Sequence, residues 1–144
     1  MIYSKATEYA LNALVYLAEQ APDDRNGVHQ IADALDIPGH FLGKILQDLR
    51  KEKIVESSRG RSGGFRLARA PAEIGLYDVV SVLEDLQRYE MCIFDEYECT
   101  VDRPCSMVCE WNAVKNHITG FLQNHSLADL QMVRQFRADL DIPK

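Results

Sequence analysis

The chain of 144 residues contains no apolar run near the ~20 residues that a membrane-spanning helix needs. Its first twenty residues are interrupted by Lys5, Glu8 and Glu19, so they lack the apolar region of a secretory signal. A Gly-rich nucleotide-binding loop, a nucleophile with a His–acid pattern and internal repeats are missing as well. These absences predict a cytoplasmic protein that has no membrane contact and is not an enzyme.

The composition is that of a folded domain, because 47% of the residues are hydrophobic and 26% are charged. The net charge of -6 is unevenly placed. Residues 1–71 carry 10 basic and 9 acidic residues, whereas residues 72–144 carry 6 basic and 13 acidic residues. Residues 44–69 contain eight basic residues and only three acidic ones, and such a local basic stripe can bind an anion. The alternative is a solvated charged face.

Apolar residues three and four positions apart predict helices, and two β-capable segments flank a Gly-rich tip. The predicted helices cover residues 4–20, 28–35, 41–53, 73–86 and 105–124, and a short last helix starts at Ser126 before a loose tail after about Phe136. The predicted strands are residues 54–55 and 65–67. This order predicts a mainly α fold with a small β-hairpin: a winged helix-turn-helix plus a long dimerisation helix.

The third helix has the pattern of a helix that enters the major groove of DNA. Its apolar residues, expected to face the core, are Phe41, Leu42, Ile45, Leu46 and Leu49. The predicted DNA-binding residues lie on this helix and on the hairpin tip: His40, Phe41, Lys44, Gln47, Arg50, Lys51, Arg59, Arg61, Ser62 and Gly63. Arginines on a Gly-rich tip can reach phosphates or a narrow minor groove. A trihelical core with an exposed basic loop is the alternative.

All four cysteines, Cys92, Cys99, Cys105 and Cys109, fall within eighteen residues. Such a cluster in a cytoplasmic protein favours metal binding or redox chemistry over structural disulfides. Zinc sites usually contain tight C-x2-4-C pairs, whereas separated thiolates suit an iron–sulfur cluster, 2Fe-2S or 4Fe-4S. The alternatives are a cofactor-free thiol redox switch, zinc, or an iron–sulfur electron carrier.

The predicted helix 105–124 has two expected roles. It would place Cys105 and Cys109 one turn apart on the same face, although Cys109 could instead be a small core residue beside Trp111. Its apolar stripe consists of Val108, Trp111, Val114, Ile118, Phe121 and Leu122. This stripe is wider than one small domain needs, so it predicts that the chain associates into a homodimer. The predicted division is therefore residues 1–86 for DNA binding, 87–110 for the cluster, and 105–144 for dimerisation and a tail.

The chain resembles the winged-helix regulators that include the iron–sulfur cluster regulator and the nitric-oxide-sensing repressor. The resemblance covers essentially the whole chain. Its marks are Ser4-Lys5, Tyr9-Ala10-Leu11, Ile31-Ala32, Phe41-Leu42, Arg50-Lys51, Arg59-Gly60, Gly63-Gly64-Phe65-Arg66-Leu67, the cysteines and Trp111. It implies a homodimer on a near-palindromic double-stranded DNA operator, with the third helix in the major groove and Arg59-type residues in the minor groove.

The resemblance also implies a cluster held by Cys92, Cys99 and Cys105 near the dimer interface, whose state tunes DNA affinity. Val108 stands where the iron–sulfur cluster regulator has a histidine ligand. The fourth ligand is therefore either Cys109 or Glu8 of the partner subunit. Gly43 and Asn12 also depart from family members that have an acidic specificity residue and a histidine there. The signal (iron, nitric oxide or redox state), the target genes and the choice between repressor and activator stay open.

Overall fold

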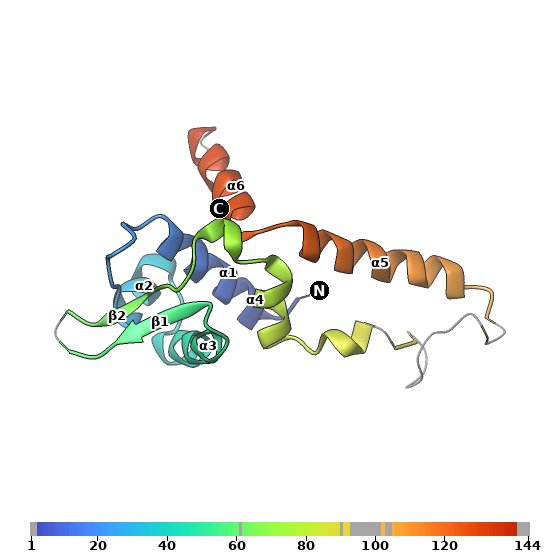
Figure 1. Ribbon diagram of the computed structural model, residues 1–144, viewed down its shortest axis with the longest axis horizontal. Helices are drawn as coiled ribbons and strands as arrows, with labels where there is room; N and C mark the ends of the chain where they lie inside the picture. Colours follow the sequence, from blue (N-terminus) through green and yellow to red (C-terminus); the bar gives the residue numbers. More distant parts are fainter. Residues whose placement is uncertain (1–2, 61, 90, 93–101, 103–104, 141–144) are drawn as a thin grey trace.

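The computed structural model describes residues 3–60, 62–89, 91–92, 102 and 105–140. The helices are α1 (Lys5–Ala18), α2 (Val28–Leu35), α3 (Gly39–Lys51), α4 (Leu76–Leu83), α5 (Val108–Asn124) and α6 (Leu127–Asp139) (Figure 1). Strands β1 (Val55–Ser58) and β2 (Gly64–Leu67) form an antiparallel hairpin, and short 3-10 helices, η1 (Pro71–Glu73) and η2 (Leu86–Tyr89), flank α4. The predicted mainly α class with a small hairpin is confirmed.

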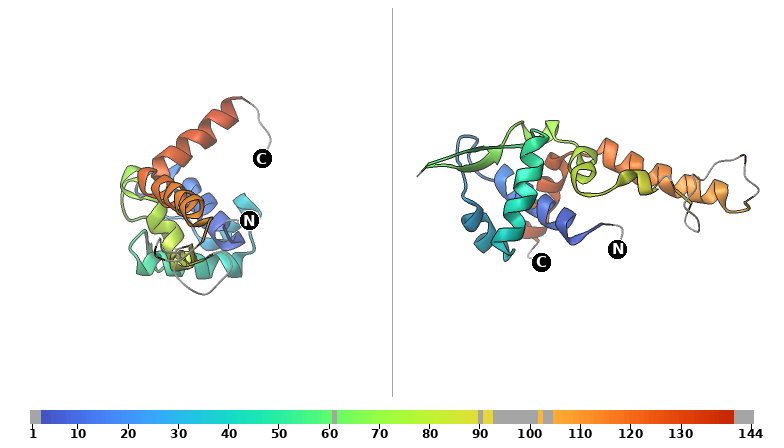
Figure 2. Two further views of the ribbon diagram at one scale, coloured as in Figure 1. Left: turned by 90° about the vertical axis from the view of Figure 1, so that its right-hand side faces the viewer. Right: turned by 90° about the horizontal axis from the view of Figure 1, so that it is seen from below.

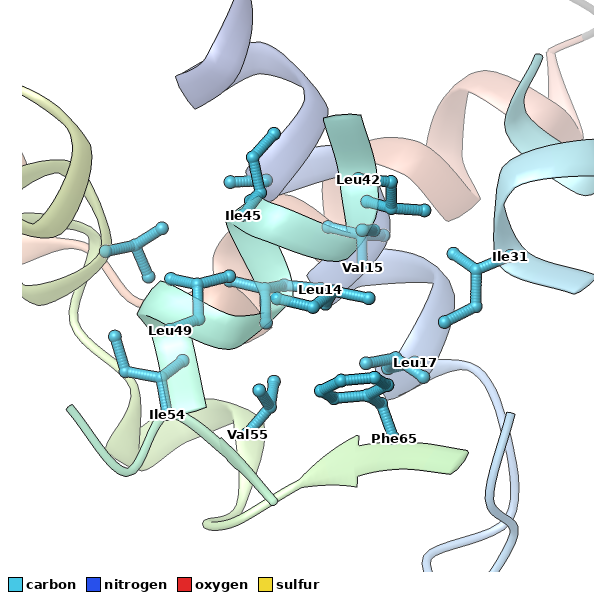
Figure 3. Packing of buried hydrophobic residues seen from close by; sticks show 14 of the residues in the cluster. Leu14, Val15, Leu17, Ile31, Leu42, Ile45, Leu49, Ile54, Val55 and Phe65 are labelled. Carbon is cyan, nitrogen blue, oxygen red and sulfur yellow. The ribbon is translucent and has the colours of Figure 1, made fainter. Parts of the chain in front are cut away.

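The core lies between α1 and α3 (Figure 3). Leu14 of α1 and Leu42, Leu46 and Leu49 of α3 are completely buried. On both helices these residues recur at helical spacing, so each helix turns one apolar stripe inward. The Ser4 hydroxyl caps α1 by accepting the N–H of Thr7. This packing leaves the opposite face of α3 in solvent.

The hairpin lies against this core through Val55 and Phe65, which are both buried. Its second strand also pairs with the turn between α1 and α2, which the sequence did not predict. Asn26 donates its N–H to the Phe65 carbonyl at 2.9 Å and accepts the Phe65 N–H at 2.8 Å. Gly64 makes this approach possible, because it has φ +150° and a Cβ there would come within 2.6 Å of the Asn26 carbonyl.

The last two helices leave the core in different directions (Figure 2). Helix α5 extends away from the helix-turn-helix, whereas α6 packs on α1 and η1. Their junction is fixed by pairing with the start of α4 and the residues just before it: Leu76 donates to the His125 carbonyl at 2.9 Å, and Leu127 donates to the Ile74 carbonyl at 2.8 Å. No helix in the described ranges is long and apolar enough to cross a membrane.

Several predicted helix bounds were wrong. Helix α3 starts at Gly39, with Pro38 as its N-cap, and ends at Lys51 and not at about Lys53. Helix α4 is shorter than the predicted 73–86, since Ile74 and Gly75 are extended and pair with the α5–α6 junction. Helix α5 begins at Val108 instead of residue 105. Helix α6 is longer than predicted, because it continues past Phe136 to Asp139, and residues 141–144 of the predicted tail lie outside the described residues.

Replacing Gly64 with alanine should destabilise the protein by roughly 2 kcal/mol, the scale of a residue forced into a strained backbone conformation. The added methyl group would meet the Asn26 backbone. Urea unfolding followed by circular dichroism measures the change in stability. Gly43→Ala is the control, because Gly43 lies within helix α3 and its added Cβ would lie 3.8 Å from Val28 Cγ1, an ordinary contact distance. It should be neutral or stabilising by up to about 1 kcal/mol. Equal stability of the two variants would contradict the role given to Gly64.

Candidate nucleic-acid interface and cysteine segment

The outward face of α3 is polar along its whole length. His40, Lys44, Gln47 and Lys51 are all exposed, as their spacing of four, three and four predicts. Their shared orientation follows from burial of the leucines on the opposite face. The arrangement can present hydrogen-bond donors to the edges of base pairs or to phosphates.

Phe41 does not belong to the buried core, which corrects the prediction that it faces inward. Its side chain is 40% exposed and touches Tyr9 of α1 edge-on, with ring centroids 5.9 Å apart. It lies in the first turn of α3, beside the completely buried Leu42. Its place next to His40 is compatible with the predicted contact to DNA.

The basic residues of 44–69 are not equally available to a ligand. Lys51 is paired with Asp48 at 2.6 Å, and its hydrogen bond lowers the pKa of that carboxyl. Arg50 donates to the Ser57 hydroxyl at 3.2 Å. Lys44 and Arg59, by contrast, form no ion pair with any residue in the described part of the chain.

The hairpin tip carries Arg59 away from the body of the protein. Arg59 follows the last residue of β1, and both Arg59 and Ser62 are exposed. Gly60 has φ +108°, and Gly63 donates to its carbonyl at 3.0 Å, which closes a tight turn. A side chain on Gly63 would collide with the Ser58 carbonyl, so Gly63 can offer only its backbone. The predicted contact Arg61 lies outside the described residues.

The described cysteines lie on two segments that one hydrogen bond brings together. The indole N–H of Trp111, on α5, donates to the carbonyl of Met91 at 3.1 Å. Cys92 is therefore next to a residue that touches the first turn of α5, the turn that carries Cys109. Cys92 is half-buried, whereas Cys105 and Cys109 are exposed. Cys99 lies outside the described residues.

Two expectations about these cysteines were wrong. Cys105 precedes α5, so it does not share a helical face with Cys109; its carbonyl accepts the Val108 N–H at 3.4 Å. Cys109 is not a small core residue, because its side chain is exposed. Among the described residues, no three His, Cys, Asp or Glu side chains come close enough together to hold a metal ion.

Glu8 lies on the exposed side of α1. Both of its carboxylate oxygens accept the Lys5 ammonium at 2.8 Å, and its own side chain is 48% exposed. A carboxylate in this position can exchange its ion pair for another ligand at little cost, because exposed ion pairs are weak.

Sequence patterns missed a polar junction between α1 and the end of α4. The Glu84 carboxylate accepts the Ser4 N–H at 2.7 Å and the hydroxyl of the fully buried Thr7. Burial opposes ionisation of Glu84, but the hydrogen bonds from Ser4 and Thr7 outweigh it and hold the Glu84 pKa below its usual value. The junction fixes the start of the segment that leads to Cys92.

A second missed group surrounds Glu56 on β1. Arg25, in the turn between α1 and α2, donates to this carboxylate at 3.0 Å, and Arg66 on β2 donates to it at 2.6 Å. Arg66 also pairs with Asp23 at 2.9 Å. Hydrogen bonding to Arg66, followed by attraction to Arg66 and then bonding to Arg25, lowers the Glu56 pKa. Only the cross-strand pair of Glu56 and Arg66 could have been found from a hairpin register.

A helix-turn-helix with a wing, a polar outer face on its third helix and an exposed arginine on the wing define a DNA-binding protein. The family model described as "Rrf2: Iron-dependent Transcriptional regulator" matches residues 3–132. The chain belongs to this family and is a DNA-binding transcriptional regulator, not an enzyme. The predicted resemblance to winged-helix regulators is thereby confirmed.

Individual relatives agree with this assignment. The transcriptional regulator NsrR of Geobacillus kaustophilus is 34% identical over 125 residues, which cover 86% of this chain and 85% of that protein. The structure of CymR, the global cysteine regulator of B. subtilis, superposes with a TM-score of 0.75 at 25% identity, covering 90% of this chain and 95% of that one. IscR of T. potens gives a TM-score of 0.70 at 27% identity, covering 92% and 85%.

Arg59→Ala should weaken binding to specific DNA by roughly 1–3 kcal/mol if the side chain enters a groove, and should lower the salt slope by about one unit for each phosphate that the variant no longer touches. Fluorescence anisotropy at several salt concentrations measures both, with duplexes selected by the wild-type protein from a random-sequence pool. Arg134→Ala is the control, because Arg134, on α6, pairs with Glu19 away from the wing. Unchanged affinity and salt slope in an Arg59→Ala/Arg61→Ala double variant would contradict this placement.

Proposed function

We propose that this regulator is a homodimer whose affinity for operator DNA is set by an iron–sulfur cluster in the cysteine segment. The observation that carries the proposal is the bond from Trp111 to Met91, which supports a site where Cys92 meets the start of α5. The family's description as iron-dependent supports the same chemistry. The signal is then iron, nitric oxide or redox state.

The donor set fits such a cluster. Thiolates are the preferred ligands of iron–sulfur clusters, and the described thiols carry no disulfide. Cys92, Cys99 and Cys105 would hold it, with Cys109 or Glu8 of the partner subunit as the fourth ligand. The cluster would supply a redox-active iron centre. The exposure of Glu8 and of Cys109 leaves both available.

The proposed DNA contacts come from α3 and the wing. His40, Phe41, Lys44 and Gln47 are the predicted α3 contacts, with Arg50 and Lys51 at its end. Arg59, Arg61, Ser62 and Gly63 are those of the wing. Lys44 and Arg59 would contribute most, since neither has an ion pair to break among the described residues. Residues 1–86 would thus bind DNA, 87–110 would hold the cluster and 105–144 would dimerise. An operator in chromosomal DNA implies a cytoplasmic location.

The proposed dimer would cover the apolar face that α5 exposes. Met107, Val114 and Phe121 are each about half exposed, at 51%, 47% and 51%. Val108 and Leu122 of the predicted stripe are buried within the chain, and Trp111 and Ile118 are half-buried. The exposed remainder supports a second copy as the partner, since a two-fold axis would place two recognition helices about one DNA turn apart.

A cofactor-free thiol switch is the second candidate, favoured by the exposure of Cys105 and Cys109 near the start of α5. Such a switch would respond to oxidants directly. Unlike a cluster protein, it would be colourless when purified without oxygen.

Anaerobically purified protein should contain iron and sulfide and absorb visible light, and Cys92→Ala should lose this absorption because a cluster needs its thiolates. Glu8→Ala and Cys109→Ala identify the fourth ligand: the true ligand's variant should have an altered spectrum and altered DNA affinity. Glu19→Ala, which removes an acid at the opposite end of α1, is the control for Glu8. Wild-type protein without iron, or Cys92→Ala with a normal cluster, would rule out this assignment.

Val114→Asp and Phe121→Asp should each turn the dimer into a monomer at micromolar concentration, because a charge would be buried in the proposed interface. Sedimentation velocity measures the change. Asn116→Asp adds the same charge at an exposed polar position of α5 and should leave the dimer intact. A wild-type monomer that still binds selected duplexes would refute the dimer.

A further inference from the structure

The carboxylate of Glu56 joins three separate pieces of the chain. One oxygen, Oε1, accepts Nε of Arg66 at 2.6 Å and Nη2 of Arg25 at 3.0 Å. Arg66 lies directly opposite Glu56 in the hairpin register, whereas Arg25 comes from the turn between α1 and α2. Arg66 reaches the same turn through Asp23 at 2.9 Å. The side chains therefore bind the wing to this turn.

The backbone makes the same connection one residue further along the hairpin. Phe65 and Asn26 exchange two hydrogen bonds, and Asn26 is 3% exposed. The turn is thus bridged to β2 at a single residue, Asn26. With both connections in place, the direction in which the hairpin leaves the core is fixed.

Glu56 balances two guanidinium groups that are mostly covered. The side chains of Arg25 and Arg66 are 24% and 30% exposed, and Nη1 of Arg25 is buried without an acceptor in the described part of the chain. Without the carboxylate, two like charges would remain side by side with less solvent than on a free surface. Arg66, one of the eight basic residues of 44–69, is therefore already engaged in ion pairs with Glu56 and Asp23.

We infer that Glu56 is a positioning residue for sequence-specific DNA recognition, because it sets the direction of the wing. Arg59 lies on this wing, directly after the end of β1. The inference rests on the proposed contact of the wing with DNA. Glu56 itself need not touch the duplex. Its removal would free the wing to turn and would release Arg25 and Arg66 toward any phosphate.

The test of this inference compares the variant Glu56→Gln with the control variant Glu52→Gln. Glu52 is the C-cap of α3, is exposed and has no ion pair among the described residues. Each variant removes one negative charge, and the two positions are four residues apart. The probes are a duplex that the wild-type protein selects from a random-sequence pool and a scrambled duplex of equal length. Affinity for each duplex and the melting temperature are measured at fixed salt.

Glu56→Gln should lower the ratio of selected to scrambled affinity by about tenfold, the scale of one specific contact, without weakening binding to the scrambled duplex. Removal of a negative charge alone should raise both affinities and keep the ratio, as expected for Glu52→Gln. Arg66→Lys, which keeps the charge but lacks the planar fork, should show the same fall in the ratio if Glu56→Gln does not fold.

The inference is overturned if Glu56→Gln and Glu52→Gln have the same ratio, or if Glu56→Gln lowers both affinities equally, as partial unfolding would. Arg59→Ala separates this failure from that of the proposed function. If Arg59→Ala lowers the ratio while Glu56→Gln does not, only the positioning role fails. If Arg59→Ala has no effect, the contact of the wing with DNA fails.

Discussion

The packing of α1 against α3 is the contact on which the proposed DNA-binding face depends. Leu14, Leu42, Leu46 and Leu49 are fully buried there, and each such side chain contributes about 1.5–3 kcal/mol through burial. Since the inner face of α3 is entirely apolar, its polar side chains have only the outer face left. The array from His40 to Lys51 is therefore a consequence of core packing, and no polar interaction is needed to orient it.

Sequence periodicity predicted best those helices that face a single core. Four of the five apolar residues expected to be buried on α3 are buried, and the exception, Phe41, packs its ring edge-on against Tyr9 and stays 40% exposed. Periodicity was less informative for α5, because this helix extends past the body. It predicted one apolar stripe, whereas Val108 and Leu122 are buried and Val114 and Phe121 are exposed, a division that depends on tertiary structure.

Pairings between segments that are distant in the chain could not be predicted from the sequence. Residues 21–27 have no hydrophobic period, so nothing indicated that Asn26 would pair with Phe65. Residue type likewise could not separate Arg66, which is committed to Glu56 and Asp23, from Arg59, which is exposed and unpaired among the described residues. The basic count of residues 44–69 therefore overstates the charge that DNA would meet. The four cysteines were the strongest site signal in the sequence, but the bond joining Trp111 to Met91 depends on the folded chain.

A regulator of the proposed kind needs a second site whose state changes the first, and the two must be joined by parts that can rearrange. The α1–α3 seam is poorly suited to this, because a close-packed core resists displacement. The junction of Glu84 with Ser4 and Thr7 is better suited. Its hydrogen bonds can be exchanged for bonds to water at a net cost of about 1 kcal/mol each. It also joins the end of α4, which leads toward Cys92, to α1, whose Tyr9 touches Phe41 on the helix proposed to bind DNA. We therefore expect a change at the cysteines to reach α3 through this polar junction rather than through the core.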